Sequence, residues 1–407
     1  MPRLASLLVP LAALALATRA RAADWEVSLD ARLVSSNGYL SPMDGGISAV
    51  RFDKDDSGLA LGRVRLALNQ PLGDLWLVHL DFSAWGGDSD NNPVGATEAY
   101  LQFRPYPFAG YRLRVKAGAF YPPTSLENRE SGWESPYTLS YSAIDSWLAE
   151  EVRTIGVEAQ LDWLGRRMGH DFDLGVTGGV FGWNEEAGGV LAADGFALTD
   201  RQTPIGGRVG QPNVGPFGDA VLFRQFDGRA GVYGGLEARW LDRVVVQALR
   251  YDNRADPTVV DTVSNVMAWE TTFDSAGARL ETEDGWTAIV QGLKGNTAIA
   301  PGGFSLVWPF KAQYALLSKR IGRHTLSARY DRFEVDTNFG AADGAEDGHG
   351  WTAAYVFTPD EHWRFTLEWV RVTSNAYLRN DAFGFPALVT ETQLQLAVRY
   401  ALGSGNY

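Results

Sequence analysis

A short segment of the chain, residues 111–121, alternates strictly between basic and apolar side chains. Successive side chains of a β-strand point to opposite faces of its sheet, so this segment places cations on one face and hydrocarbon on the other. The basic members are Arg112, Arg114 and Lys116, and the apolar members are Leu113, Val115 and Ala117. A sheet built from such strands needs water on one side and an apolar medium on the other.

The same period of two recurs along most of the chain. Alternating hydrophobicity over ~10 residues, with turn residues between the segments, is the sequence signature of a transmembrane β-barrel. No stretch has a convincing helical period with caps at both ends. We count sixteen candidate strands, at residues 25–34, 61–68, 74–85, 98–104, 111–121, 153–161, 170–181, 231–241, 242–251, 269–281, 285–293, 310–321, 323–333, 350–357, 362–372 and 390–402.

The connections between these strands alternate between short and long. An outer-membrane barrel has tight periplasmic turns and long external loops, whereas a soluble sandwich has no reason to gather its long loops at one end. The short connections are 69–74, 104–111, 164–170, 241–242, 283–285, 321–323 and 358–361, and the long ones include 38–57, 121–152, 183–230, 252–264, 336–348 and 374–390. The pattern predicts an all-β, 16-stranded antiparallel transmembrane barrel with long extracellular loops and periplasmic termini.

The N-terminal residues have the features of a secretory signal peptide. Arg3 precedes an apolar run over residues 4–17, and a small-x-small pattern ends at Ala22. The run is shorter than the roughly 20 residues of a membrane-spanning helix. We therefore assign 1–22 to a signal peptide and 23–407 to a barrel in the outer membrane. The formal charge of -13 argues against nucleic acid as a partner.

Alternation also assigns the two faces of the barrel wall. A barrel has lipid outside and water inside, and an Arg or Lys on the lipid face at the midplane costs ~2–4 kcal/mol. The bases of the second, fourth and fifth strands are therefore expected to point into the lumen and to form a basic strip there. The predicted pore-lining bases are Arg63, Arg65, Arg104, Arg112, Arg114 and Lys116.

The long connection 121–152 is the candidate constriction loop. It carries aromatic residues such as Trp133, Tyr141 and Trp147, which a disordered loop would lack. We expect this loop to fold inward, to pack on the wall and to narrow the channel, with its acids facing the wall bases across the pore. These acids are Glu127, Glu130, Glu134 and Asp145. The alternative is that the acids are solvated on an external loop.

Residues 115–161 resemble the phosphate-selective porin O/P-like family. The shared pattern is a glycine-containing strand, an aromatic-Pro-x-Ser-x-Glu turn and an Arg-x-x-Gly-Val strand start. It consists of Gly118, Phe120, Pro122, Pro123, Ser125, Glu127, Arg153, Gly156 and Val157. The strand number and the long loop after the fifth strand also look like the trimeric outer-membrane porins of Gram-negative bacteria. The resemblance implies a homotrimer in contact with outer-membrane lipid and lipopolysaccharide.

Other chemistries have weaker support in the sequence. His79, Asp81 and Ser83 share one strand face, but a rise of ~3.3 Å per residue spreads them over ~13 Å, too far for direct proton transfer. The acidic runs 53–56 and 88–92 offer oxygen ligands that suit Ca²⁺, or are solvated loop tips. We expect no enzyme activity, no cofactor and no resident metal, and an adhesin or structural barrel stays as an alternative.

Taken together, these features predict a porin that lets small hydrophilic solutes or ions diffuse passively through a water-filled channel. The competing hypothesis is a substrate-selective channel for an anion, phosphate or sugar. Both hypotheses use the same wall bases and loop acids, and they differ in whether a solute binds inside the pore.

Overall fold

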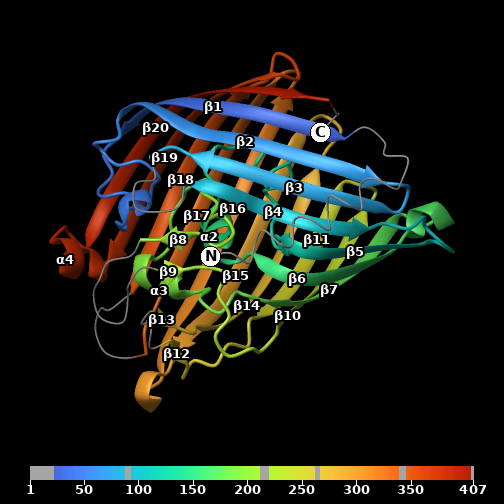
Figure 1. Cartoon of the computed structure of the whole chain (residues 1–407). Coiled ribbons are helices and arrows are strands. Elements are labelled where there is room, and N and C mark those ends of the chain that lie inside the picture. Colours follow the sequence, from blue (N-terminus) through green and yellow to red (C-terminus); the bar gives the residue numbers. More distant parts are fainter. Residues whose placement is uncertain (1–22, 88–92, 211–219, 262–265, 339–344, 405–407) are drawn as a thin grey trace.

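The computed structural model describes residues 23–87, 93–210, 220–261, 266–338 and 345–404, and the predicted signal peptide lies outside them. Sixteen antiparallel strands form one closed barrel in which β20 pairs with β1 (Figure 1). The predicted strand number is confirmed. The barrel strands are β1 (Asp24–Ser36), β2 (Gly58–Leu72), β3 (Trp76–Trp85), β4 (Val94–Phe103), β5 (Tyr111–Phe120), β6 (Thr154–Trp163), β7 (Phe172–Gly182), β10 (Gly231–Trp240), β11 (Val244–Asp252), β14 (Glu270–Glu281), β15 (Trp286–Ile299), β16 (Leu306–Ile321), β17 (His324–Val335), β18 (Glu346–Phe357), β19 (Trp363–Ala376) and β20 (Leu388–Gly403).

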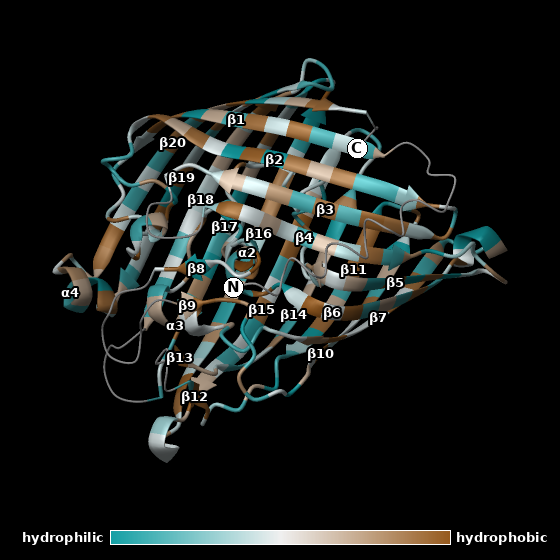
Figure 2. Ribbon diagram, in the orientation of Figure 1, coloured by the Kyte–Doolittle hydropathy of each residue, from teal (hydrophilic) through white to brown (hydrophobic). Residues whose placement is uncertain are grey.

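The two faces of the wall follow the alternation in the sequence. On β5, Leu113 and Ala117 are exposed on the outside, whereas Arg112 and Arg114 are half-buried on the inside. Figure 2 shows hydrophilic and hydrophobic residues alternating along β1, β2 and β3. Because the sheet closes on itself, each barrel strand has a hydrogen-bonded neighbour on both sides, as spanning a bilayer requires.

The long connections lie at one end of the barrel and carry short elements of their own (Figure 1). Three of them hold α-helices, which the sequence analysis did not predict. Among the described residues, none of the helices has the length and apolar character needed to cross a bilayer. The added elements are η1 (Pro42–Asp44), α2 (Ala143–Glu151), α3 (Gly189–Asp194), η3 (Pro301–Gly303), α4 (Tyr377–Phe383), and the two-stranded sheets β8 (Arg208–Val209) with β9 (Ala220–Val221) and β12 (Val260–Asp261) with β13 (Val266–Met267). A further short helix, η2 (Gly165–Met168), lies in the connection between β6 and β7.

Part of the barrel interior is filled by these loops. The Trp147 ring of α2 lies 5.3 Å from the Phe273 ring of β14 and 5.0 Å from the Phe310 ring of β16. Phe196, from the connection between β7 and β10, joins the same cluster. Where these rings pack, the inner face of β14 and β16 is apolar and covered, because loop side chains replace water against it. On this side of the barrel, loop side chains rather than water contact the inner wall.

Candidate functional site

The loop between β5 and β6 crosses the barrel and fastens to strands on the other side. Leu126 donates its backbone N–H to Gln291 of β15 at 3.3 Å, and Ala143 donates to Asp331 of β17 at 3.0 Å. Further along the wall, Leu139 donates to Glu368 of β19 at 2.6 Å. Three strand side chains thus hold the loop backbone, and the predicted inward fold of 121–152 is confirmed.

A fully buried ion cluster fixes the middle of this loop. Arg329 of β17 contacts Glu127 at 2.6 Å and Asp331 at 2.8 Å, and none of these three side chains is exposed. Arg329 also donates to the carbonyl oxygens of Ser140 at 2.8 Å and Tyr141 at 2.6 Å. A buried charge needs both a counter-charge and hydrogen bonds, and Arg329 has both. Glu127, predicted to face the pore, instead ties the loop to the wall.

Asp145 is the second predicted pore acid that does not reach water. It lies in the first turn of α2, fully buried, and its Oδ2 accepts a hydrogen bond from Ser125 at 2.7 Å. Burial, and then the nearby Glu127 carboxylate, raise the pKa of Asp145 well above its ordinary value. Its role is to pack the helix rather than to present a charge to solute.

Glu134 and Glu130 do meet wall bases, in direct contact. Glu134 lies 3.3 Å from Arg63 of β2 and is ion-paired with Arg399 of β20. Burial alone would favour its neutral form, but Arg399 and then Arg63 outweigh that effect and lower the pKa of Glu134 to about 2. Glu130 pairs with Arg364 of β19 at 2.9 Å. These pairs neutralise charge at the loop instead of leaving acids and bases apart across open water.

The structure divides the predicted wall bases into three groups. Arg63 and Arg65 are only 5% and 2% exposed because loop residues 131–134 cover them. Arg65 is held by Asp81 at 2.6 Å and Glu26 at 2.9 Å. Arg104 is not on the wall: β4 ends at Phe103, and Arg104 is exposed in the following turn. Its assignment to the pore lining is wrong because the predicted strand ran one residue too far.

The third group, on β5, stays accessible inside the lumen. Arg112 and Arg114 contact Asp162 of β6 at 2.9 and 3.0 Å, and their side chains are 33% and 31% exposed. Lys116 lies 3.6 Å from Glu158 and is 25% exposed, whereas the two carboxylates are almost fully covered. The cations therefore present themselves to water more than their partners do. These two acids were not among the predicted site residues, although their alternation along β6 places them on the lumen face.

The accessible charged surface continues around the periplasmic end of the lumen. Arg239 pairs with Glu237 on β10, and Arg129 of the loop pairs with Glu281 at the end of β14. A cavity of about 400 Å³ lies at this mouth. Its charged lining has four arginines against two aspartates: Arg112, Arg166, Arg167 and Arg239, with Asp173 and Asp242.

The opposite side of the loop is closed. Arg32 of β1 contacts Asp200 at 2.6 Å, and Asp200 also pairs with Arg51 at 2.8 Å. Only about 40 Å³ is free between these residues, the loop and β19–β20, which is room for roughly one or two waters. Among the described residues, the accessible lumen charges therefore lie on the β5 side of the loop.

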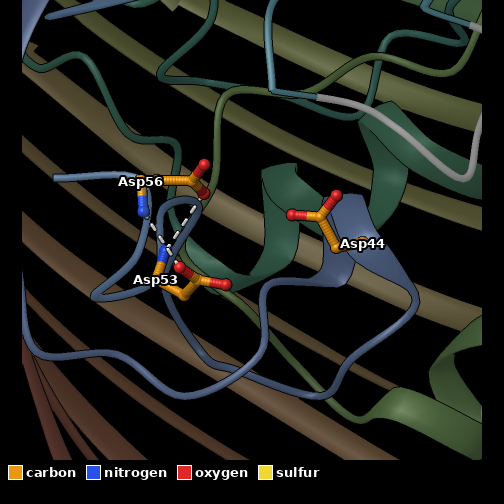
Figure 3. A group of neighbouring side chains, drawn as sticks. All are labelled: Asp44, Asp53 and Asp56. Atoms are coloured by element: carbon orange, nitrogen blue, oxygen red, sulfur yellow. Dashed lines mark hydrogen bonds between the residues drawn. The ribbon is translucent and has the colours of Figure 1, made fainter. Parts of the chain in front are cut away.

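Most of the remaining sequence candidates have structural partners among the described residues. His79 bonds to Asn69 at 2.7 Å and stacks on Tyr100, while the carboxylate of Asp81 is taken by Arg65. Asp53, from the acidic run 53–56, groups with Asp44 and Asp56 in the first long loop (Figure 3). Its Oδ1 accepts the backbone N–H groups of the turn, which explains an aspartate there without an ion. The run 88–92 lies outside the described residues.

Comparison with known proteins identifies the fold. No model of a known protein family matches the chain, and no curated protein does. OmpF of Salmonella typhi is 10% identical, with a TM-score of 0.54 over 93% of this chain and 97% of that one. The outer-membrane channel DcaP of Acinetobacter baumannii is 13% identical (TM-score 0.52; 94% and 97% covered), and an anion-selective porin from Comamonas acidovorans is 12% identical (TM-score 0.50; 94% and 100% covered). At these identities the likeness shows the fold alone, and that fold is the 16-stranded barrel of outer-membrane porins.

Proposed function

We propose that this protein is an outer-membrane porin through which small hydrophilic solutes and ions diffuse passively. The observation that carries the proposal is a lumen that is covered on one side and charged and accessible on the other. The inward loop leaves Arg112, Arg114 and Lys116 in contact with lumen water. The likeness to barrels described as porins and channels supports the same function. Nothing in this function requires a catalytic group or a cofactor.

We further propose a preference for anions, which selects one branch of the substrate-selective hypothesis. In the ion pairs of Arg112 and Arg114 with Asp162, the arginine side chains are exposed and the carboxylate is covered. Arginines also outnumber aspartates in the lining of the periplasmic cavity. A pore lined by one sign of charge concentrates the opposite ion. The resemblance of residues 115–161 to phosphate-selective porins makes phosphate one candidate solute, beside organic anions.

The test is the reversal potential of single channels in a salt gradient across a planar bilayer. Arg112→Ala/Arg114→Ala is expected to shift this potential toward cation preference, because it leaves Asp162 unpaired on the lumen wall. Arg371→Ala on the outward face of β19 is the matched control and is expected to leave it unchanged. An unchanged potential in the double variant contradicts the assigned path. Saturable block by added phosphate would support a selective channel, and a purely ohmic response a general pore.

We also propose that the protein assembles as a homotrimer. The support is its resemblance to trimeric porins and the apolar outer face of β1, β2 and β4, where Leu33, Leu59 and Val94 are 57%, 86% and 66% exposed. A trimer would cover such a surface. Native mass spectrometry in detergent measures this directly, and a single-chain mass would contradict it.

A further inference from the structure

A row of charged side chains lies on the outside of the barrel, where the alternation predicts hydrocarbon. All six members are on the outward faces of five neighbouring strands, and their inward neighbours, such as Leu249, Leu293 and Phe333, are buried. Side chains of the row are up to 65% exposed. This outer charge row consists of Arg250 of β11, Asp274 of β14, Lys294 of β15, Lys311 of β16, and Arg332 and Glu334 of β17.

The row lies at the height expected for lipid headgroups. On β15 the outward residues run from Trp286 near the short turn, through apolar Ala288, Val290 and Gly292, to Lys294, which is eight positions along (294 − 286). At ~3.3 Å per residue and a tilt of ~40°, those positions rise ~20 Å, close to the ~25 Å height of the apolar band of a barrel. The row therefore lies at the extracellular edge of that band, in the outer leaflet.

The charges of the row do not balance one another. Arg250 pairs with Asp274 at 3.0 Å, and Lys311 pairs with Glu334 at 2.8 Å. Lys294 and Arg332 have no ion pair with any residue in the described ranges, so four cations face two carboxylates. Lys294 lies opposite Lys311 in the β15–β16 register and opposite Asp274 in the β14–β15 register, where the Asp274 carboxylate is ion-paired with Arg250 instead. Like charges placed directly opposite each other on neighbouring strands repel, and an anion between them would remove that repulsion.

A hollow in the outer wall begins at this row. It has a volume of about 870 Å³ and is bounded by small outward residues, including Gly234, Ala248, Ala276 and Gly292, with members of the row at its edge. A second hollow of about 640 Å³ shares four lining residues with the first, three of them small and the fourth Gln313, and extends to Ala278 and Ala315, toward the short-turn end of the barrel. An apolar hollow beneath a cationic row has the shape and polarity of an amphiphile with a phosphorylated head.

We propose that the outer charge row and this hollow bind a phosphorylated lipid of the outer leaflet, of the lipid A type that anchors lipopolysaccharide. Its phosphates bind Lys294, Lys311 and Arg332, and an acyl chain lies over Ala248 and Ala276. Phosphate oxygens accept charge-assisted hydrogen bonds from ammonium and guanidinium groups. The inference rests on the proposed outer-membrane location, and it is independent of the selectivity of the pore.

A second copy of this chain fits the row less well than a lipid does. It would have to bring carboxylates to Lys294 and Lys311. Near the same edge of the band, the outward residues of β1, β2 and β4 are Leu33, Leu59 and Val94, which carry no charge. The phosphates of a lipid headgroup supply the negative charge that the outer face of β1, β2 and β4 lacks.

The test is native mass spectrometry of the full-length protein in detergent, titrated with bis-phosphorylated lipid A and with the same lipid after removal of both phosphates. Lys294→Gln/Lys311→Gln is expected to weaken binding of the phosphorylated lipid about 10- to 30-fold. The matched control is Lys319→Gln, at the periplasmic end of β16, where Lys319 bonds to Asp284 at 3.1 Å. The control is expected to bind like the wild type, and the dephosphorylated lipid is expected to bind weakly to all three proteins.

A second variant tests the hollow separately. Ala276→Phe fills it with hydrocarbon on a lipid-facing site, so the barrel is expected to fold and acyl-chain binding to fall. Equal affinity of the wild type and Lys294→Gln/Lys311→Gln would overturn the proposal. So would a wild-type oligomer that becomes a monomer in this double variant, because a second copy would then cover the row. Single-channel conductance is expected to be the same in all these variants, so failure of the pore function and failure of lipid binding are distinguishable.

Discussion

Arg329 on β17 and Arg112 on β5 both point into the lumen, but their surroundings differ. Arg329 is completely buried between Glu127 and Asp331, and it also holds loop carbonyl oxygens. Arg112 is ion-paired with Asp162, and a third of its side chain remains exposed. The first arginine therefore fastens the loop to the wall, whereas the second leaves part of its charge accessible in the lumen. The face that a charge occupies does not decide its role, because the loop covers one wall and leaves the other open.

The largest expected effect comes from removing the buried arginine. Arg329→Met leaves the carboxylates of Glu127 and Asp331 buried without their counter-charge, and breaking such a pair costs about 3–5 kcal/mol. We expect the loop to leave the wall, so that single-channel conductance rises and the thermal unfolding temperature of the purified barrel falls. Both quantities are measured on protein refolded in detergent.

Arg112→Met is the matched control for this experiment. Its partner Asp162 lies beside lumen water and also contacts Arg114, so the unfolding temperature is expected to change little. If Arg112→Met and Arg329→Met destabilise the barrel equally, the contrast between the two walls is wrong.

Much of the fold could be predicted from the sequence because its causes are local. The period of two and the alternation of loop lengths are properties of neighbouring residues, and they give sixteen strands and the faces of β5. Whether a loop covers a wall base depends on residues that are far apart in the sequence, since Arg329 and Glu127 are 202 positions apart. Helix α2 had a local signal that was missed: Ser142 caps it by accepting the N–H of Asp145.

Alternation by itself also leaves open which face of a strand points inward. On β15 and β16 the lysines Lys294 and Lys311 are outside and Leu293 is inside, the reverse of the rule that holds on β5. The apolar inner residues of these strands, such as Leu293 and Phe310, are buried in a cluster with loop side chains. A face assignment based on charge therefore fails where a loop fills the barrel.

A pH titration sharpens the comparison at the loop tip. The pKa of Glu134 is about 2, below its ordinary value of 4.5, because Arg399 and Arg63 outweigh the effect of burial. A depressed pKa stabilises the folded state above pH 4.5, and this contribution is lost as the pH falls through about 2. Protease protection of the loop is expected to persist at pH 4 and to decline toward pH 2. In Glu134→Gln this decline is expected to be smaller, and an identical profile would contradict the assignment.

The smallest expected effect concerns Gly132, at the point where the loop meets Arg63 and Arg65. Its φ is 74°, and a Cβ there would collide with both guanidinium groups. Gly206 has nearly the same φ, 73°, but a Cβ there would meet no atom within 4 Å.

Gly206→Ala therefore measures the backbone strain alone, about 1 kcal/mol. Gly132→Ala adds overpacking of about 1–3 kcal/mol, because the loop tip must move away from the β2 arginines. We expect Gly132→Ala to lower the unfolding temperature more than Gly206→Ala and to raise conductance slightly. Equal effects of the two substitutions would mean that the loop tip does not pack on β2 as closely as these contacts require.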